Sequence, residues 1–259
     1  MKKTNTLLKW GYSALCLLGL TLSSCTQEEI DKLVNQAQNN PPSGLTPSNN
    51  VPIPSWDDAH GVLVTTKVKA LNSGVSLEVG VANAVFFSAA GDTSFVDAGT
   101  VKVESKALVK EANNSYSFVP SQTEPNGIAY TNPVTWEVSG NGTVPAINQD
   151  LTGTWPDADS ITSALTFDNN SAYTLTASTV SGADSVIFMV VGSDGKYLLK
   201  YLGGNATTCT FTQAEMANIA PGTGLVQVVP LKVTTNTSGS RKYYYVRQTA
   251  VARTVTVND

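Results

Sequence analysis

The chain has few of the side chains that most catalytic and metal sites require. Its 259 residues include one histidine, three cysteines and three methionines. Ordinary zinc and iron sites need several histidine or cysteine ligands, and a cysteine nucleophile needs a partner base. No Gly-x-Ser-x-Gly elbow is present for serine chemistry. We therefore predict a non-catalytic protein with no metal site and no cofactor, and a hydrolase is the least supported alternative.

Charged side chains are also scarce, at 14% of the chain against a usual ~25%. The sequence carries 16 basic and 20 acidic residues. Removing an N-terminal leader that contains Lys2, Lys3 and Lys9 would leave 13 basic residues against 20 acidic ones, a net charge of −7. An acidic body of this kind argues against nucleic acid and against anionic lipid surfaces as partners.

The N-terminus has the pattern of a secretory leader. A cationic start at Lys2 and Lys3 precedes an apolar run from Leu7 to Leu22. The run is shorter than the ~20 apolar residues of a transmembrane helix, and it suits the apolar region of a signal peptide.

The end of this leader, Leu22-Ser23-Ser24-Cys25, resembles the bacterial lipobox. The resemblance implies that Cys25 receives a diacylglycerol, that residues 1–24 are removed and that the protein is held at a membrane by lipid. Acyl chains contribute ~0.8 kcal/mol for each buried CH₂. Cys16 would be removed with the leader, so Cys209 would have no disulfide partner. Residues 207–211 around Cys209 have the alternating pattern of a strand, which predicts a buried structural thiol.

Acidic residues directly behind Cys25 resemble the surface-export signal of Bacteroidetes-type lipoproteins. The alternative is the first turn of a helix, where Glu and Asp favour the positive end of the helix dipole. We expect a lipid-anchored protein of the bacterial outer membrane, exposed at the cell surface, with the periplasmic face as the alternative.

Residues 25–55 are rich in Asn, Ser and Pro, and they predict a flexible tether. Only Ile30, Leu33, Val34 and Ala37 show a helical repeat. From Trp56 onward the apolar residues recur with period two and turn residues separate the runs, which predicts an all-β fold. We predict two tandem β-sandwich domains, 56–152 and 160–259.

The predicted strands and the single helical turn are as follows. The N-terminal domain has strands near 62–71, 75–81, 100–109, 116–119 and 134–138. The C-terminal domain has strands near 164–167, 173–177, 186–191, 196–202, 207–211, 225–233, 242–246 and 252–257. Thr212 and Glu215 have the spacing of a capping box that opens a short helix.

Two segments resemble known families. Pro133–Ile147 is similar to a segment of uncharacterised Bacteroidetes-type β-sandwich lipoproteins, in which it leads out of the first domain. Pro221-Gly222-Thr223 before a long strand resembles fibronectin type III and related Ig-like domains. Gly224-Leu225 departs from that pattern, which usually has an aromatic residue there. The second resemblance implies that the C-terminal domain is Ig-like.

Aromatic residues supply the only candidates for ligand binding. Trp155 lies at the predicted domain junction, where it either packs or stacks on a sugar. Tyr243 and Tyr245 share one face of a strand and Tyr244 takes the other. We interpret one of these faces as core and the other as exposed, with ordinary cross-strand pairing as the alternative.

The leading hypothesis is a cell-envelope lipoprotein with an adhesion, scaffold or accessory binding role. The alternative is a glycan-binding lipoprotein of a polysaccharide-uptake system. The expected partners are the membrane, through the lipid anchor, and a glycan or a protein at the surface.

Overall fold

The computed structural model describes residues 56–259 except 73, 74, 93 and 122, so Cys25 and the predicted tether lie outside the described residues. Strands dominate this part of the chain, and its one α-helix is the short α3 (Gln213–Met216). The all-β prediction is confirmed. No helix in the described part is long and apolar enough to cross a membrane.

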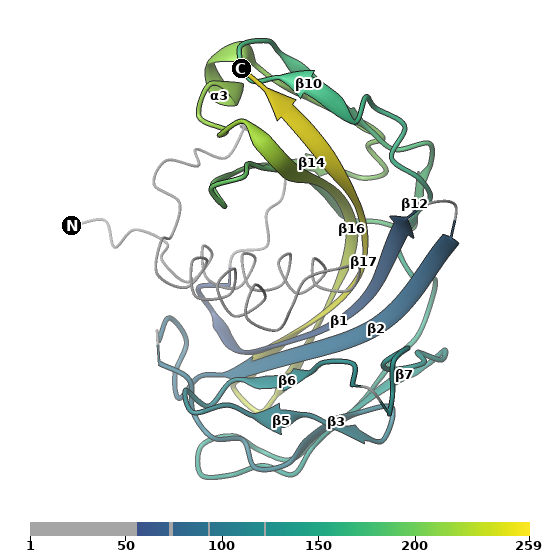
Figure 1. Cartoon of the computed structure of the whole chain (residues 1–259). Helices are drawn as coiled ribbons and strands as arrows, with labels where there is room; N and C mark the ends of the chain where they lie inside the picture. Colours follow the sequence, from purple (N-terminus) through teal and green to yellow (C-terminus); the bar gives the residue numbers. More distant parts are fainter. Residues whose placement is uncertain (1–55, 73–74, 93, 122) are drawn as a thin grey trace, which may run out of the picture.

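One long, strongly curved sheet organises the molecule (Figure 1). It has nine strands, and β10 pairs in parallel with the end of β17 beside the main path β14-β13-β16-β17-β1-β2-β6-β5. In that order the strands are β14 (Tyr197–Gly203), β13 (Ser185–Val191), β16 (Gly222–Ser238), β17 (Arg241–Asn258), β1 (Ala59–Asn72), β2 (Val75–Phe86), β6 (Tyr116–Phe118) and β5 (Val109–Lys110), with β10 at Thr166–Asp168.

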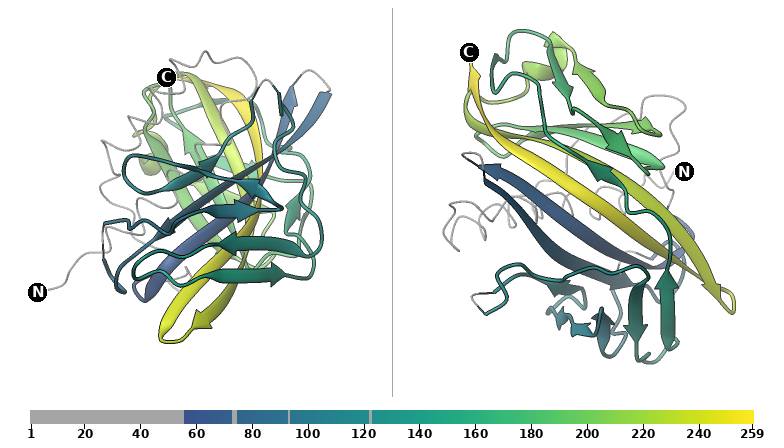
Figure 2. Two further views of the ribbon diagram at one scale, coloured as in Figure 1. Left: turned by 90° about the horizontal axis from the view of Figure 1, so that it is seen from below. Right: turned by 90° about the vertical axis from the view of Figure 1, so that its right-hand side faces the viewer.

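Smaller sheets cover the convex side of this sheet (Figures 1 and 2). One has the order β4-β3-β7-β8, and the other two are the pairs β11-β15 and β12-β9. Their strands are β3 (Val101–Val103), β4 (Lys106–Ala107), β7 (Val134–Val138), β8 (Ile147–Leu151), β9 (Asp157–Ala158), β11 (Tyr173–Thr176), β12 (Val180–Ser181) and β15 (Thr208–Phe211).

Two apolar cores lie between the long sheet and these covers. The N-terminal core surrounds Trp136 of β7, which is fully buried as its alternating strand predicts, and it includes Leu63 and Phe86 of the long sheet. The C-terminal core joins Phe188 of β13 to Phe211 of β15. Each half of the chain therefore forms a two-layered sandwich.

The C-terminal half has the strand arrangement of an Ig-like sandwich. Its long-sheet strands lie in the order β14-β13-β16-β17, and β11 pairs with β15 in the facing layer. This matches the C′-C-F-G sheet and the opposing B–E strands of Ig domains. Before β16, Thr212 caps α3 with its side chain and Glu215 completes the capping box, as the sequence indicates.

The two sandwiches share a sheet, which differs from a simple tandem arrangement. β1 pairs in parallel with β17, from Ala59 opposite Lys242 to Ala70 opposite Ala252. The first strand of the predicted domain 56–152 thus lies beside the last strand of the predicted domain 160–259 (Figure 2). Periodicity predicts strands but does not specify which distant strands pair. The predicted strands 242–246 and 252–257 are likewise one continuous strand, β17.

A close backbone contact closes the N-terminal sandwich beside β2. The Gly80 N–H donates to the Asn126 carbonyl (3.1 Å), and the Ile128 N–H donates to the Gly80 carbonyl (2.9 Å). A Cβ atom at Gly80 would lie 1.9 Å from the Ile128 carbonyl oxygen. The contact therefore requires a residue without a side chain at position 80.

We predict that Gly80→Ala lowers the free energy of unfolding by about 3 kcal/mol, because backbone must move to admit the methyl group. Gly203→Ala is the matched control, since no atom lies within 4 Å of a Cβ built there. It should change stability by less than about 0.5 kcal/mol. Urea denaturation of both variants measures the difference, and equal stabilities would contradict the close contact.

Candidate functional site

The predicted tyrosine surface is part of the protein interior. Tyr243 and Tyr245 are each 1% exposed and belong to the N-terminal core, and Tyr244 on the opposite face is 6% exposed. The interpretation of one exposed face is therefore wrong. β17 is a central strand between β16 and β1, so both of its edges are paired, and Tyr243 and Tyr245 pack in the N-terminal core on its convex face. Burial also raises the pKa of Tyr245.

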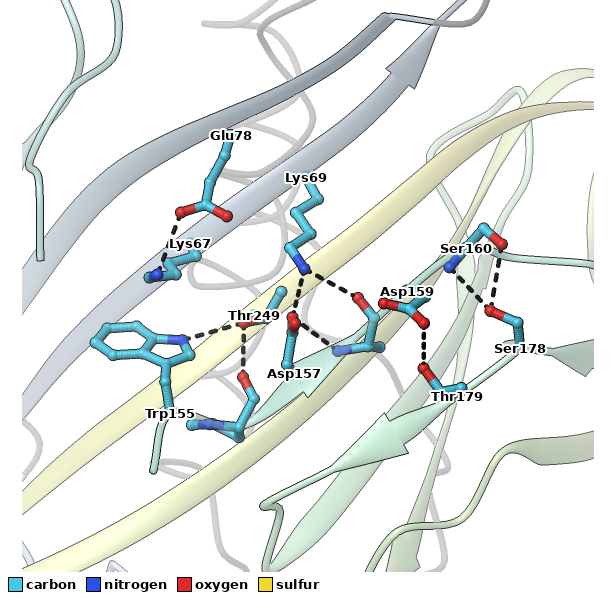
Figure 3. A network of polar contacts seen from close by, with 12 residues as sticks. Lys67, Lys69, Glu78, Trp155, Asp157, Asp159, Ser160, Ser178, Thr179 and Thr249 are labelled. Atoms are coloured by element: carbon cyan, nitrogen blue, oxygen red, sulfur yellow. Dashed lines mark hydrogen bonds and ion pairs between the residues drawn. The ribbon is translucent and has the colours of Figure 1, made fainter. Parts of the chain in front are cut away.

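Trp155 lies at the junction of the two sandwiches, and its ring is already engaged (Figure 3). It stacks on Tyr130 with ring centroids 4.9 Å apart, and the Lys67 ammonium lies 5.1 Å from the centroid of its ring. Its indole N–H donates to Oγ1 of Thr249 (3.0 Å). These contacts match the packing alternative for Trp155. They leave the sugar-stacking hypothesis an untested prediction.

Polar contacts around Trp155 fasten the connector between the sandwiches to the convex face of the long sheet (Figure 3). Thr249 donates to the Pro156 carbonyl (2.7 Å). The Lys69 ammonium contacts an Asp157 carboxylate oxygen at 2.6 Å and also donates to the Ala158 carbonyl (3.4 Å). The network therefore joins β1 and β17 to β9, and it positions the two halves of the chain.

Arg247 completes this attachment from inside the protein. Its side chain is 2% exposed, and Nη1 donates to the Gly153 carbonyl (3.1 Å). Desolvation lowers the pKa of Arg247, and the carboxylate of Asp184 partly opposes this effect. The arginine therefore holds the connector through a backbone oxygen.

The other chemically reactive residues are held in structural contacts. Cys209 is a buried free thiol, as the sequence predicts, and burial raises its pKa to about 11.

Nδ1 of His60, the single histidine, accepts the Lys242 backbone N–H (3.2 Å). Asp58 accepts hydrogen bonds from the Tyr244 hydroxyl (2.6 Å) and from Lys242 (2.9 Å), and these contacts lower its pKa. Within the described ranges, no group of three His, Cys, Asp or Glu residues could hold a metal ion.

The opposite side of the long sheet carries a broad apolar surface, which we call the concave face. Its buried members are 0 to 8% exposed, and all of them are strand residues of the long sheet except Trp56. They are Trp56, Ala59, Val64, Ile187, Met189, Val191, Leu199, Val229, Leu231, Tyr244, Val246 and Ala250. No strand or helix of the described part lies inside the curve of the sheet (Figure 1).

The concave face has few polar groups, and a pair near its centre is satisfied internally. Nε2 of Gln248 donates to Oγ1 of Thr66 (2.9 Å), and both side chains are buried at 1% exposure. At one end of the face, Trp56 packs edge-on against Tyr244 with ring centroids 4.7 Å apart. The chain therefore enters the first strand along this face.

Sequence reasoning missed the concave face, although one signal was present. Residues 186–191 of β13 are apolar without alternation. Such a run is typical of a strand that is covered on both faces. The predicted anchor residue Cys25 lies outside the described residues.

Comparisons with known proteins do not assign this chain to a family. No protein-family model matches it, and no curated protein matches it. Among solved structures, it is similar to a chain in the crystal structure of Dpr11 IG1 bound to DIP-gamma IG+IG2. The identity is 10%, the match covers 76% of this chain and 96% of that chain, and the TM-score is 0.21. The Ig-like arrangement of the C-terminal half follows from its own strand order.

We predict that Thr249→Val lowers the free energy of unfolding by about 2 kcal/mol, because it removes a buried hydroxyl that both accepts and donates. Thr210→Val is the matched control, since that exposed hydroxyl pairs only with Thr174 on the neighbouring strand. Its effect should stay below about 0.5 kcal/mol. Thermal or urea unfolding of the two variants provides the measurement, and a neutral Thr249→Val would show that the junction does not depend on this hydroxyl.

Proposed function

We propose that this protein is a non-catalytic lipoprotein of the bacterial cell envelope that acts by binding, as an adhesion or scaffold component at the outer membrane. The leader and the lipobox-like end at Cys25 support the anchor. The acidic charge of the chain favours a protein or neutral partner over nucleic acid.

The concave face is the observation that carries the binding role. It is a wide apolar face of the long sheet that no described strand or helix covers (Figure 1), and burying apolar area contributes roughly 25 cal/mol for each Å² removed from water. Aliphatic side chains and few polar groups suit a polypeptide segment with an apolar stripe. Hydrophobic grooves bind amphipathic helices through the apolar face of the helix.

The glycan alternative has less support. Sugar recognition would use exposed aromatic rings, yet Tyr243 and Tyr245 are buried. One face of Trp155 stacks on Tyr130, and Lys67 lies over the same ring system. The favoured partner is therefore a polypeptide.

The anchor is tested by metabolic labelling with a fatty-acid analogue. We expect the native protein to take up the label and fractionate with the outer membrane, because Cys25 supplies the thiol that carries the lipid. Cys25→Ala should lose both properties, whereas Cys16→Ala, in the predicted leader, should retain them. Labelling that survives Cys25→Ala would disprove the proposed anchor.

The class of partner is tested on a glycan array with the purified Cys25→Ala protein. We expect no oligosaccharide to be retained above the level of an unrelated β-sandwich protein, because the aromatic rings are engaged internally. Retention of a defined sugar that Trp155→Ala weakens would overturn this expectation and favour the glycan-uptake alternative.

A further inference from the structure

Strand β16 extends past its neighbour β13 and leaves part of its edge open. β13 pairs with β16 only from Leu225 to Leu231, whereas β17 pairs with it as far as Ser238. We call the stretch from Lys232 to Ser238 the β16 arm, and it ends in the hairpin turn before β17 (Figure 2). In the described part of the chain no strand lies beside the outer edge of this arm. The opening accommodates a strand of typical length, roughly five to six residues.

A hydrogen bond of Val233 shows which backbone groups point to the open edge. Its N–H donates to a carboxylate oxygen of Asp184 (2.9 Å), which directly precedes β13 and therefore lies on the side away from β17. Backbone groups alternate between the two sides of a strand, so the N–H and C=O groups of Thr235 and Thr237 also point outward. The side chain of Asn236 accepts the Thr237 N–H (2.7 Å). No described residue uses the outward N–H and C=O of Thr235 or the outward C=O groups of Val233 and Thr237.

The two terminal strands of the main sheet path have features that block such pairing. β5 is only two residues long, and its Lys110 pairs with Asp97 (2.8 Å). On β14, the Lys200 ammonium donates to the Thr210 carbonyl of the facing sheet (2.9 Å) and pairs with Glu215 (2.8 Å). Short edge strands and lysine side chains are common means by which proteins prevent strand addition.

The β16 arm lacks this protection. From Val233 to Ser238 every side chain is uncharged, and residues 235–238 are exposed. Thr234, Thr235 and Thr237 lie in this stretch. Threonine favours strands and forms favourable cross-strand pairs with other β-branched or hydroxyl side chains. The arm therefore offers both the backbone groups and the side chains that a further strand would pair with.

We propose that the β16 arm binds an extended segment of a partner protein, which adds to the long sheet in line with β13 and antiparallel to β16. The outward backbone groups supply the hydrogen bonds of this strand addition, and the partner segment carries Thr, Ser or Val side chains opposite the arm. Lys232 forms no ion pair within the described residues, so an acidic residue of the partner segment pairs with it. The site is a sheet edge, separate from the concave face and independent of the anchor at Cys25.

A second copy of the chain fits this edge less well. Antiparallel pairing of two arms centred on Thr235 would place Gly239 of one copy opposite Leu231 of the other. β13 already occupies that position, because Ser185 pairs with Leu231. A partner segment can leave the sheet at Lys232, whereas the hairpin turn of a second copy is fixed there.

The test measures binding of a fluorescent, capped peptide, Thr-Val-Thr-Val-Thr-Glu, to the purified Cys25→Ala protein by fluorescence polarisation. We expect saturable binding below about 1 mM. Thr235→Pro should weaken it at least about tenfold, because it removes the outward N–H and places a ring against the added strand. Thr235→Ala is the matched control, since it keeps the N–H, and its affinity should stay within about threefold of the unchanged arm.

Two further measurements make the result independent of how Thr235→Pro folds. Its urea unfolding should match that of the parent protein, because proline is tolerated in an edge strand where the N–H faces outward. The peptide is also made with N-methyl groups on alternate residues, in both possible patterns. The pattern that removes the N–H groups facing the arm should abolish binding, and the other pattern should retain it.

Other outcomes would overturn the proposal. A peptide that does not saturate by about 1 mM, or equal binding of the two methylated peptides, would exclude strand addition at this edge. Binding that Thr235→Pro leaves unchanged would assign the peptide to another surface, such as the concave face. A dimer in sedimentation experiments that Thr235→Pro dissociates would assign the edge to a second copy. Failure to label Cys25 would disprove the anchor and leave the peptide result intact.

Discussion

The parallel pairing of β1 with β17 is the constraint on which the rest of the structure depends. It joins the start of the described chain to its end and merges two sandwiches into one long sheet. Because β17 then has neighbours on both edges, its three consecutive tyrosines lie at the centre of the sheet, with Tyr243 and Tyr245 in the N-terminal core and Tyr244 in the concave cluster. The same pairing creates the long curved surface whose concave side is apolar.

The two faces of the sheet have different chemistry at its centre. On the convex side, Arg247, Thr249 and the lysines of β1 are polar, and they hold the connector between the sandwiches. On the concave side, aliphatic residues dominate and the Thr66–Gln248 pair is satisfied internally. One face therefore fixes the two halves relative to each other, and the other face is apolar.

Much of the local structure follows from the sequence. The strand around Trp136, the apolar strand β13 and the capping box at Thr212 were predicted from alternation, composition and spacing. Trp155 lies between β8 and β9, in the connector that Gly and Pro residues mark in the sequence. The tyrosines were misassigned because alternation distinguishes the two faces of a strand but does not reveal whether one or both are covered.

The sequence by itself determined that the chain is all-β and where most strands lie, and it predicts a lipobox-like leader at the N-terminus. Local periodicity and motif chemistry carry that information within short stretches of residues. Only the tertiary structure decided that the halves share a sheet, that Tyr243 and Tyr245 are buried and that a concave apolar face exists. Those features depend on hydrogen bonding between strands about 180 residues apart, and pairing at that distance leaves no local pattern in the sequence.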